Sequence, residues 1–194
     1  MSKLYFRYAA MNAGKSTMLL QAAHNYAERG MSVKLYTAQL DDRHGVGVIR
    51  SRLGIQRSAL TYDPATSFNE QLLDADTACL FVDEAQFLTG PQVHQLHRLA
   101  HIGKVPIICY GLRSDFLGMP FDGASILLTL ADDIEEIKTI CACGKKATMN
   151  ARIDSMGNRV RTGEQIFIGG EANYIAMCPD CFYTDAEHAL KSGN

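Results

Sequence analysis

The stretch that decides the fold is "YAAMNAGKST", residues 8–17. It ends with Gly14, Lys15 and Ser16, as a phosphate-binding loop does, but Ala9 stands where that motif begins with glycine. Glycine is needed where φ is positive or where the backbone crowds a ligand, and an alanine forced into the left-handed conformation costs roughly 1–2 kcal/mol. We expect the loop to tolerate that cost and to bind phosphate, rather than to be a small-residue turn that binds nothing.

The residues around the loop supply the context that it requires. An apolar run at residues 4–8 predicts a strand, and the following pattern predicts a helix from about residue 15 to residue 29, ended by Gly30. Between a strand and a helix, the backbone N–H groups and the helix amino end attract phosphate, and Lys15 reaches the β- and γ-phosphate oxygens. Ser16 is placed to offer its hydroxyl to Mg²⁺.

Composition limits the class of protein. The 194 residues suffice for one domain with a small appendage, and 47% hydrophobic with 21% charged residues indicates a folded, globular chain. Lys and Arg total 19 and Asp and Glu total 21, so the net charge of -2 argues against a nucleic-acid coat protein. The sequence shows no secretory signal and no run near the ~18 apolar residues of a membrane span. We therefore expect a cytoplasmic protein without a membrane or nucleic-acid partner.

Strand and helix patterns alternate over about the first 130 residues. Apolar runs at residues 32–37, 78–84 and 105–111 predict strands, and residues 90–103 predict a helix. Alternation of this kind predicts an α/β fold whose parallel sheet is covered by helices on both faces.

The chain after residue 138 changes texture and carries two close cysteine pairs. Short alternating runs and many glycines predict a small β-rich module, so we expect domains at residues 1–138 and 139–194. The pairs, in "CAC" and "CPDC", comprise Cys141, Cys143, Cys178 and Cys181. Four thiolates complete a closed tetrahedral site, which predicts structural Zn²⁺. A zinc ribbon that binds nucleic acid is the alternative, but the module has no basic and aromatic stripe. Cys79 and Cys109 lie alone in apolar runs and are expected to be core thiols.

The segment "VDEAQF" supplies the acids that a phosphate loop needs. Asp83 follows an apolar strand, where P-loop proteins hold Mg²⁺ directly or through water. Glu84 should project beside the γ-phosphate, where a carboxylate can take a proton from the attacking oxygen. Two solvated turn residues are the bland alternative. If Glu84 activates water the protein is an ATPase, and if it activates a bound hydroxyl the protein is a kinase; the spacing does not decide between them.

Five motifs, in this order, resemble one family over nearly the whole chain. They are "AMNAGKST", "VDEAQF", "YGLRSDFLGMPF", "TICACGKKA", and "FIGGEANY" followed by "CPDC". Together they are similar to the bacterial branch of the type II thymidine kinases, whose members carry a non-glycine residue at the position of Ala9. The resemblance implies a RecA-like P-loop domain and a zinc-ribbon-like domain that carries a lasso loop. It also implies transfer of the γ-phosphoryl group of ATP to the 5′-hydroxyl of thymidine, and of deoxyuridine, in nucleotide salvage for DNA synthesis.

The resemblance further implies roles for individual residues. Glu84 would be the proton acceptor, with Lys15 and Arg43 at the reacting phosphate. The residues implied to bind ATP and Mg²⁺ are Ala9, Ala10, Met11, Asn12, Ala13, Gly14, Lys15, Ser16, Thr17, Asp83 and Gln86. Those implied to bind the nucleoside are Met11, Phe87, Leu112, Phe116, Phe121, Ile166, Phe167, Ile168, Gly169, Gly170 and Tyr174.

Assembly and regulation follow from the resemblance alone. It implies a homotetramer and feedback inhibition by the end product dTTP. Two other functions stay open at this point. One is a P-loop ATPase that couples hydrolysis to motion or to a nucleic acid, and the other is a zinc-ribbon binding module with a regulatory phosphate loop. Neither explains "FIGGEANY" and "YGLRSDF" together.

Overall fold

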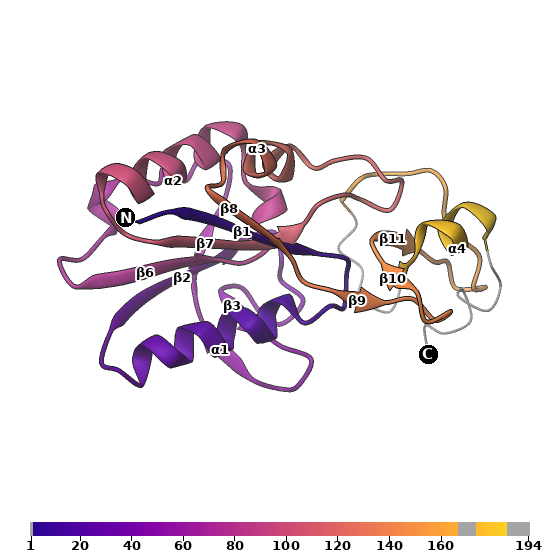
Figure 1. The fold of residues 1–194 in the computed structure, drawn as a ribbon, viewed down its shortest axis with the longest axis horizontal. Helices are drawn as coiled ribbons and strands as arrows, with labels where there is room; N and C mark the ends of the chain where they lie inside the picture. The colour runs from indigo at the N-terminus through magenta and orange to yellow at the C-terminus, as the bar shows by residue number, and fades with distance from the viewer. Residues whose placement is uncertain (1, 167–173, 186–194) are drawn as a thin grey trace.

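The computed structural model describes residues 2–166 and 174–185, and its centre is a six-stranded sheet (Figure 1). The strands stand in the order β5-β2-β6-β7-β1-β8, and every neighbouring pair is parallel. Their bounds are β1 Leu4–Ala9, β2 Ser32–Ala38, β5 Leu60–Tyr62, β6 Thr77–Val82, β7 Ile107–Leu112 and β8 Asp133–Glu136. The predicted α/β fold is confirmed. The strand expected at residues 78–84 ends at Val82, so Asp83 and Glu84 lie just beyond it.

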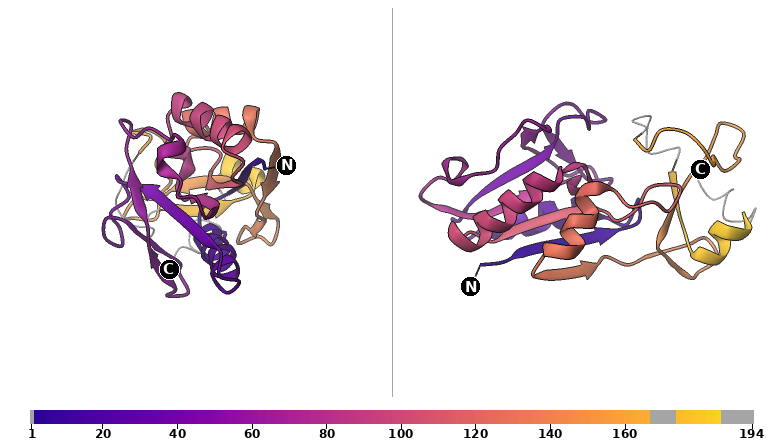
Figure 2. Two further views of the ribbon diagram at one scale, coloured as in Figure 1. Left: turned by 90° about the vertical axis from the view of Figure 1, so that its left-hand side faces the viewer. Right: turned by 90° about the horizontal axis from the view of Figure 1, so that it is seen from above.

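Helices cover both faces of this sheet. α1 (Lys15–Ala27) lies on one face, and α2 (Gly90–Ile102) and α3 (Asp122–Leu130) lie on the other (Figure 1, Figure 2). The predicted helices at residues 15–29 and 90–103 are confirmed, each ending slightly earlier than expected. Within the described part of the chain, no helix is both long and apolar enough to cross a membrane.

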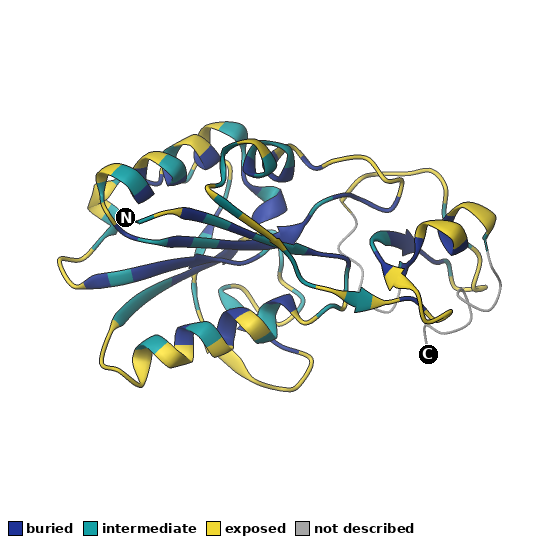
Figure 3. Cartoon of the chain, in the orientation of Figure 1, coloured by how far each residue is buried: buried dark blue, intermediate teal, exposed yellow. Residues whose placement is uncertain are grey.

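The central strands supply side chains to two separate cores. In β6, Leu80 and Val82 pack with α2 and α3, whereas Cys79 and Phe81 pack with α1. Successive strand side chains point to opposite faces, so a strand covered on both faces reads as a continuous apolar run. Figure 3 shows the outcome: the strands are largely buried, and exposed residues lie on the outer sides of the helices. Cys109, like Cys79, is fully buried, as predicted.

Several short elements have no counterpart in the sequence prediction. β3 (Val48–Arg50) and β4 (Gln56–Ser58) form an antiparallel hairpin outside the main sheet. Two 3₁₀ turns, η1 (Glu70–Leu72) and η2 (Ala85–Phe87), follow β5 and β6. Each of these elements has only three residues, which is too short for a hydrophobic period to be read.

A second, smaller unit lies beyond the end of the sheet where the strands finish (Figure 1, Figure 2). Its elements are β9 Thr139–Ile140, β10 Lys146–Ala147, β11 Met149–Arg152, β12 Tyr174–Met177 and α4 Pro179–Thr184. β9 pairs with β10 and β11 with β12, both antiparallel. Its own apolar cluster includes Ala151, Met177 and Phe182. The predicted β-rich texture is confirmed, and the boundary between residues 138 and 139 stays a prediction.

The packing of α3 against η2 generates a stability prediction. A Cβ atom added at Gly123 would lie 2.5 Å from the carbonyl oxygen of Leu88 and 2.9 Å from that of Ala85. Both obstacles are backbone, so we expect Gly123→Ala to shift α3 and to destabilise the fold by about 1–3 kcal/mol. Urea unfolding followed by circular dichroism would measure the change.

Gly90→Ala is the matched control, because Gly90 also lies in the first turn of a helix. Its added Cβ would meet Ile126 Cγ1 at 3.8 Å, an ordinary contact. We expect a change within about 0.5 kcal/mol of zero, or a small stabilisation from the reduced freedom of the unfolded chain. Equal effects of the two substitutions would contradict the packing argument.

Candidate active site

The phosphate loop begins directly at the end of β1. Ala9 is the last residue of that strand and pairs with Leu112 of β7, so its backbone is extended. The left-handed positions of the loop are Asn12, with φ of 63°, and Gly14, with φ of 83°. The cost expected for a left-handed alanine therefore does not arise at position 9. The motif dispenses with its opening glycine because this position needs no positive φ.

A cavity of about 470 Å³ lies over this loop. Residues 11–17, Asp83 and Glu84 contribute to its lining. The basic side chains that also line it are Lys15, Arg43, His44, Arg50 and Arg52. Lys15 is buried, and its Nζ donates to the carbonyl oxygen of Ala10 at 3.2 Å. Cationic side chains and a helix amino end face one space here, an arrangement that suits a polyphosphate.

Asp83 lies in this cavity, where burial raises the pKa of its carboxyl group to about 7. The Glu84 carboxylate adds to the rise, whereas the hydrogen bonds from the Glu84 N–H and the Ser16 hydroxyl, and the charge of Lys15, oppose it. Ser16 Oγ donates to Asp83 Oδ2 at 3.0 Å. A hydroxyl and a carboxylate this close, beside a phosphate loop, form the pair with which P-loop proteins hold Mg²⁺, so these residues fit that ion.

The backbone of Glu84 adopts the left-handed conformation, with φ of 52° and ψ of 36°. For a residue other than glycine this costs roughly 1–2 kcal/mol. Two hydrogen bonds hold the turn in place. The hydroxyl of Tyr62 donates to the Glu84 carbonyl oxygen at 2.7 Å, and the Glu84 N–H donates to Asp83 Oδ1 at 3.0 Å. Backbone strain that the surroundings support in this way is common where a side chain has to be aimed.

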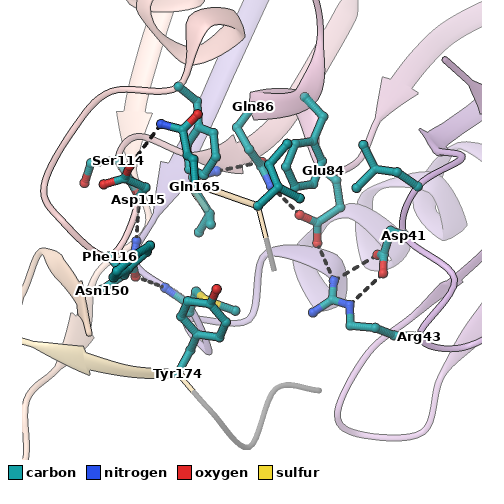
Figure 4. Close-up of a pocket in the computed structure, with 16 residues that line it drawn as sticks. Asp41, Arg43, Glu84, Gln86, Ser114, Asp115, Phe116, Asn150, Gln165 and Tyr174 are labelled. Atoms are coloured by element: carbon teal, nitrogen blue, oxygen red, sulfur yellow. Dashed lines mark hydrogen bonds and ion pairs between the residues drawn. The ribbon is translucent and has the colours of Figure 1, made fainter. Parts of the chain in front are cut away.

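The carboxylate of Glu84 is held from two sides (Figure 4). Arg43 Nη2 donates to Oε1 at 2.9 Å, and Gln86 Nε2 donates to Oε2 at 2.5 Å. Each partner is itself anchored. Arg43 makes a bidentate pair with Asp41 at 2.6 and 2.8 Å, and Gln86 Oε1 accepts the N–H of Leu112 at 3.0 Å. The carboxylate is thus oriented by contacts from η2 and from the loop after β2, and the η2 contact is itself anchored on β7.

A second cavity, of about 70 Å³, lies on the other side of Glu84. Its apolar lining is Met11, Leu40, Phe87, Leu112, Phe116, Phe121 and Ile166. Its polar lining includes Gln86, Ser114, Asp115, Asn150, Gln165 and Tyr174, many of which Figure 4 labels. Five residues line both cavities: Met11, Asp41, Arg43, Glu84 and Leu112. Glu84 therefore lies at the junction of a cationic phosphate cavity and a largely apolar one.

The smaller unit contributes directly to the phosphate loop. Asn150 of β11 is buried; its Oδ1 accepts the N–H of Met11 at 2.7 Å, and its Nδ2 donates to the carbonyl oxygen of Ser114 at 2.8 Å. Asn12 Nδ2 donates to the carbonyl oxygen of Tyr174 in β12 at 3.3 Å. The β11–β12 pair thus holds the loop that faces the phosphate cavity.

The four paired cysteines come together in the smaller unit, three of them as part of its apolar cluster. Their sulfur atoms all lie within 4.8 Å of one another, and the sulfurs of Cys143 and Cys178 are 3.5 Å apart. Burial opposes ionisation of the Cys141 thiol, but hydrogen bonds from the N–H groups of Cys143 and Cys178 lower its pKa to about 7. Burial and the neighbouring thiols raise the pKa of Cys181. Bonds of about 2.3 Å to one tetrahedral ion place sulfurs about 3.8 Å apart, so this donor set fits structural Zn²⁺.

Comparison with known proteins agrees with this geometry. A family model described as "Thymidine kinase" matches residues 2–182. A thymidine kinase of Albidiferax ferrireducens is 66% identical over 186 residues, covering 96% of this chain and 94% of the relative. The chain belongs to the thymidine kinase family. Thymidine kinases of Chromobacterium violaceum and Idiomarina loihiensis are 59% and 50% identical, covering 95% and 92% of this chain and 100% and 94% of the relatives.

The structure brings most of the residues implied by the thymidine kinase family to the two cavities. Residues 11–17, Asp83 and Arg43 line the phosphate cavity, whereas Ala9 and Ala10 are buried outside its lining. Gln86, implied for the ATP side, lines only the apolar cavity. The implied nucleoside residues that line the apolar cavity are Met11, Phe87, Leu112, Phe116, Phe121, Ile166 and Tyr174. Phe167, Ile168, Gly169 and Gly170 lie outside the described residues.

Sequence reasoning missed several residues of the site. Asp41 was within reach, because an acid two positions before an arginine in "DDRHG" is a readable signal. Arg50 and Arg52, in the run "RSR", are a second such signal. No such signal exists in the sequence for Tyr62 or Asn150. The backbone partner of Asn150 lies 139 positions earlier in the chain, and no local pattern connects the two.

The contact between Asn150 and Met11 predicts that the smaller unit supports nucleotide binding. Asn150 lines the apolar cavity and not the phosphate cavity. Asn150→Ala leaves the Met11 N–H without its partner, and an unsatisfied buried donor costs about 1–3 kcal/mol. We expect the Kd of ADP, measured calorimetrically without nucleoside, to rise about tenfold. Removing the metal with a strong chelator should weaken ADP binding in the same direction.

Asn158→Ala is the matched control, since Asn158 is an exposed asparagine in the same unit. It should leave ADP affinity unchanged. An unchanged Kd in Asn150→Ala, from protein with wild-type metal content, would show that the loop holds its conformation without this contact.

Proposed function

We propose that this chain transfers the γ-phosphoryl group of ATP to the 5′-hydroxyl of thymidine, giving dTMP and ADP, with deoxyuridine as a second acceptor. The family match and relatives named thymidine kinase support the proposal. The observation that carries it is the position of Glu84 between a cationic phosphate cavity and a largely apolar one. A kinase needs a proton acceptor at the point where phosphate donor and acceptor hydroxyl meet.

Each residue at the junction has a defined part in the transfer. The phosphate loop and Lys15 bind the phosphates of ATP, and Ser16 with Asp83 would hold Mg²⁺. When bound, that ion neutralises phosphate charge. The 5′-oxygen forms a bond to the γ-phosphorus as the bond from that phosphorus to the ADP oxygen breaks, and Glu84 accepts the hydroxyl proton. Arg43, which contacts Glu84 and lines both cavities, stabilises negative charge on the group in transit.

The apolar cavity is the proposed nucleoside site. Its lining is mostly apolar with a few polar side chains, which suits a nucleoside. One wall is braced by Arg152, whose guanidinium carbon lies 3.8 Å from the centre of the Phe116 ring. The same guanidinium donates to the carbonyl oxygens of Thr162 and Glu164, at 3.1 Å each. Arg152 therefore links this wall to the segment that leads toward residue 166.

Further features of the proposal rest on the family resemblance. We infer that "FIGGEANY", residues 167–174, is a lasso that binds the nucleobase, and that the four cysteines hold Zn²⁺ as a clamp for the two ends of the lasso. We likewise infer a cytoplasmic homotetramer that dTTP inhibits as the end product. The cysteine cluster supports the zinc assignment, because four thiolates leave a tetrahedral ion no open position.

The reaction itself can be tested by following both products. We expect purified protein with Mg-ATP to form ADP and dTMP in equal amounts, and only when thymidine is present. ADP without dTMP would make Glu84 a water activator and the protein an ATPase. No product from folded, zinc-loaded protein would contradict both functions.

The role of Glu84 predicts a specific kinetic defect. Glu84→Gln keeps the size of the side chain but removes its basicity, so kcat should fall at least ~100-fold while ATP and thymidine still bind. Glu28→Gln is the control, because Glu28 is an exposed glutamate at the end of α1. Turnover by Glu84→Gln at the rate of that control would remove Glu84 from the proton transfer.

A further inference from the structure

Two histidines and one carboxylate meet at the end of the sheet opposite the phosphate loop. His97 and His101 lie four residues apart on α2, and Asp132 lies between α3 and β8. Their ligand atoms all lie within 4.8 Å of one another, and the two imidazole rings are 4.6 Å apart, centre to centre. Residues four apart on a helix are neighbours on its surface, so the two imidazoles can serve one ligand.

The carboxylate of this cluster is held in place by the backbone. Asp132 Oδ2 accepts the N–H of Leu4, the first residue of β1, at 2.8 Å, and lies 3.0 Å from His101 Nε2. Two ligands on one ion, with bonds of about 2.1 Å, are separated by roughly 3.0–3.4 Å. His101 and Asp132 therefore already stand at the spacing of a metal-binding pair.

His97 completes the set with a side-chain movement alone. Its ring nitrogen lies no more than 4.8 Å from the other two ligand atoms, so it has to approach by at most roughly 1.5 Å. Rotation about the side-chain bonds of a half-buried histidine supplies that movement, and α2 need not shift. The i, i+4 spacing on α2 thus places a second imidazole beside the pair of His101 and Asp132.

The donor atoms select the kind of ion. Two of the three are imidazole nitrogens, which suit Zn²⁺, Co²⁺, Ni²⁺ and Cu²⁺, whereas Mg²⁺ and Ca²⁺ prefer oxygen ligands. The side chains of His101 and Asp132 are 33% and 25% exposed, so water can fill the remaining coordination positions. The set differs in this respect from the four cysteines, whose thiolates leave no position open.

We propose that His97, His101 and Asp132 bind one divalent transition-metal ion of the Zn²⁺ type. The ion takes the place of the direct contact between His101 and Asp132 and links α2 to the connection between α3 and β8. Because Asp132 also holds the start of β1, binding stabilises this end of the sheet. The site lies apart from both cavities and does not depend on the proposed reaction.

A titration with Zn²⁺ alone tests the proposal. Protein whose cysteine site is already filled is titrated calorimetrically, and its thermal midpoint is recorded with and without the added ion. We expect the protein to bind one further equivalent of Zn²⁺ and to unfold at a higher midpoint temperature. His97→Ala, His101→Ala and Asp132→Asn should each weaken that equivalent at least about tenfold and abolish the thermal shift. Asp132→Asn retains an oxygen for the Leu4 N–H, so it separates the loss of a ligand from the loss of that backbone contact.

His24→Ala is the matched control. His24 lies on α1 with Glu28 at 3.4 Å, and among the described residues no second histidine joins this pair of imidazole and carboxylate. The His24→Ala variant should bind the further equivalent of Zn²⁺ with the affinity of the wild type. The proposal is overturned if the wild type binds no further Zn²⁺, if His101→Ala or Asp132→Asn retains full affinity, or if His24→Ala loses the equivalent as well. Equal affinity for Mg²⁺ would also overturn it, because the nitrogen donors would then play no part.

Discussion

The left-handed turn at Glu84 is the constraint on which the arrangement of the site depends. β6 ends at Val82, and Asp83 contacts Ser16 in the phosphate cavity. One residue later the turn brings the next carboxylate to the boundary of the apolar cavity. Two consecutive acids thereby reach two different places, Asp83 the phosphate cavity and Glu84 its junction with the apolar cavity. The strain of roughly 1–2 kcal/mol is similar in size to the roughly 0.5–1.5 kcal/mol of a hydrogen bond such as that from Tyr62, so the surrounding structure can hold the turn.

The smaller unit completes the site rather than standing beside it. Asn150 joins the backbone of Met11 to that of Ser114, and Asn12 reaches the backbone of Tyr174. Met11 lines both cavities, so the smaller unit holds a residue that belongs to both sides of the site. The position of the unit follows from the sheet. The strand ends that carry the phosphate loop and Asp83 face the same side, and the unit lies beyond them.

The fold was predictable where local pattern and packing agree. Continuous apolar runs indicated β6 and β7 because both faces of those strands are covered. The hairpin of β3 and β4 was not predictable, since three-residue strands carry no period and this pair depends on the surface that it covers. The orientation of Gln86 was also not predictable. The family resemblance implied a role on the ATP side, but the side chain is oriented by contacts with Glu84 and Leu112, which lie at the ends of two different strands.

The sequence by itself determined the chemistry of this protein: a lysine and a serine after Gly14, two acids after a strand, and four paired cysteines. These are readable because each depends on residue type and short spacing. Only the tertiary structure decided which ligand each group faces. It placed Ala9 in an extended strand, aimed Glu84 at the junction of two cavities, and brought Asn150 against a loop 139 positions earlier. The physical reason is that hydrogen bonds between distant segments form only after the sheet has brought strand ends together, and no local pattern records them.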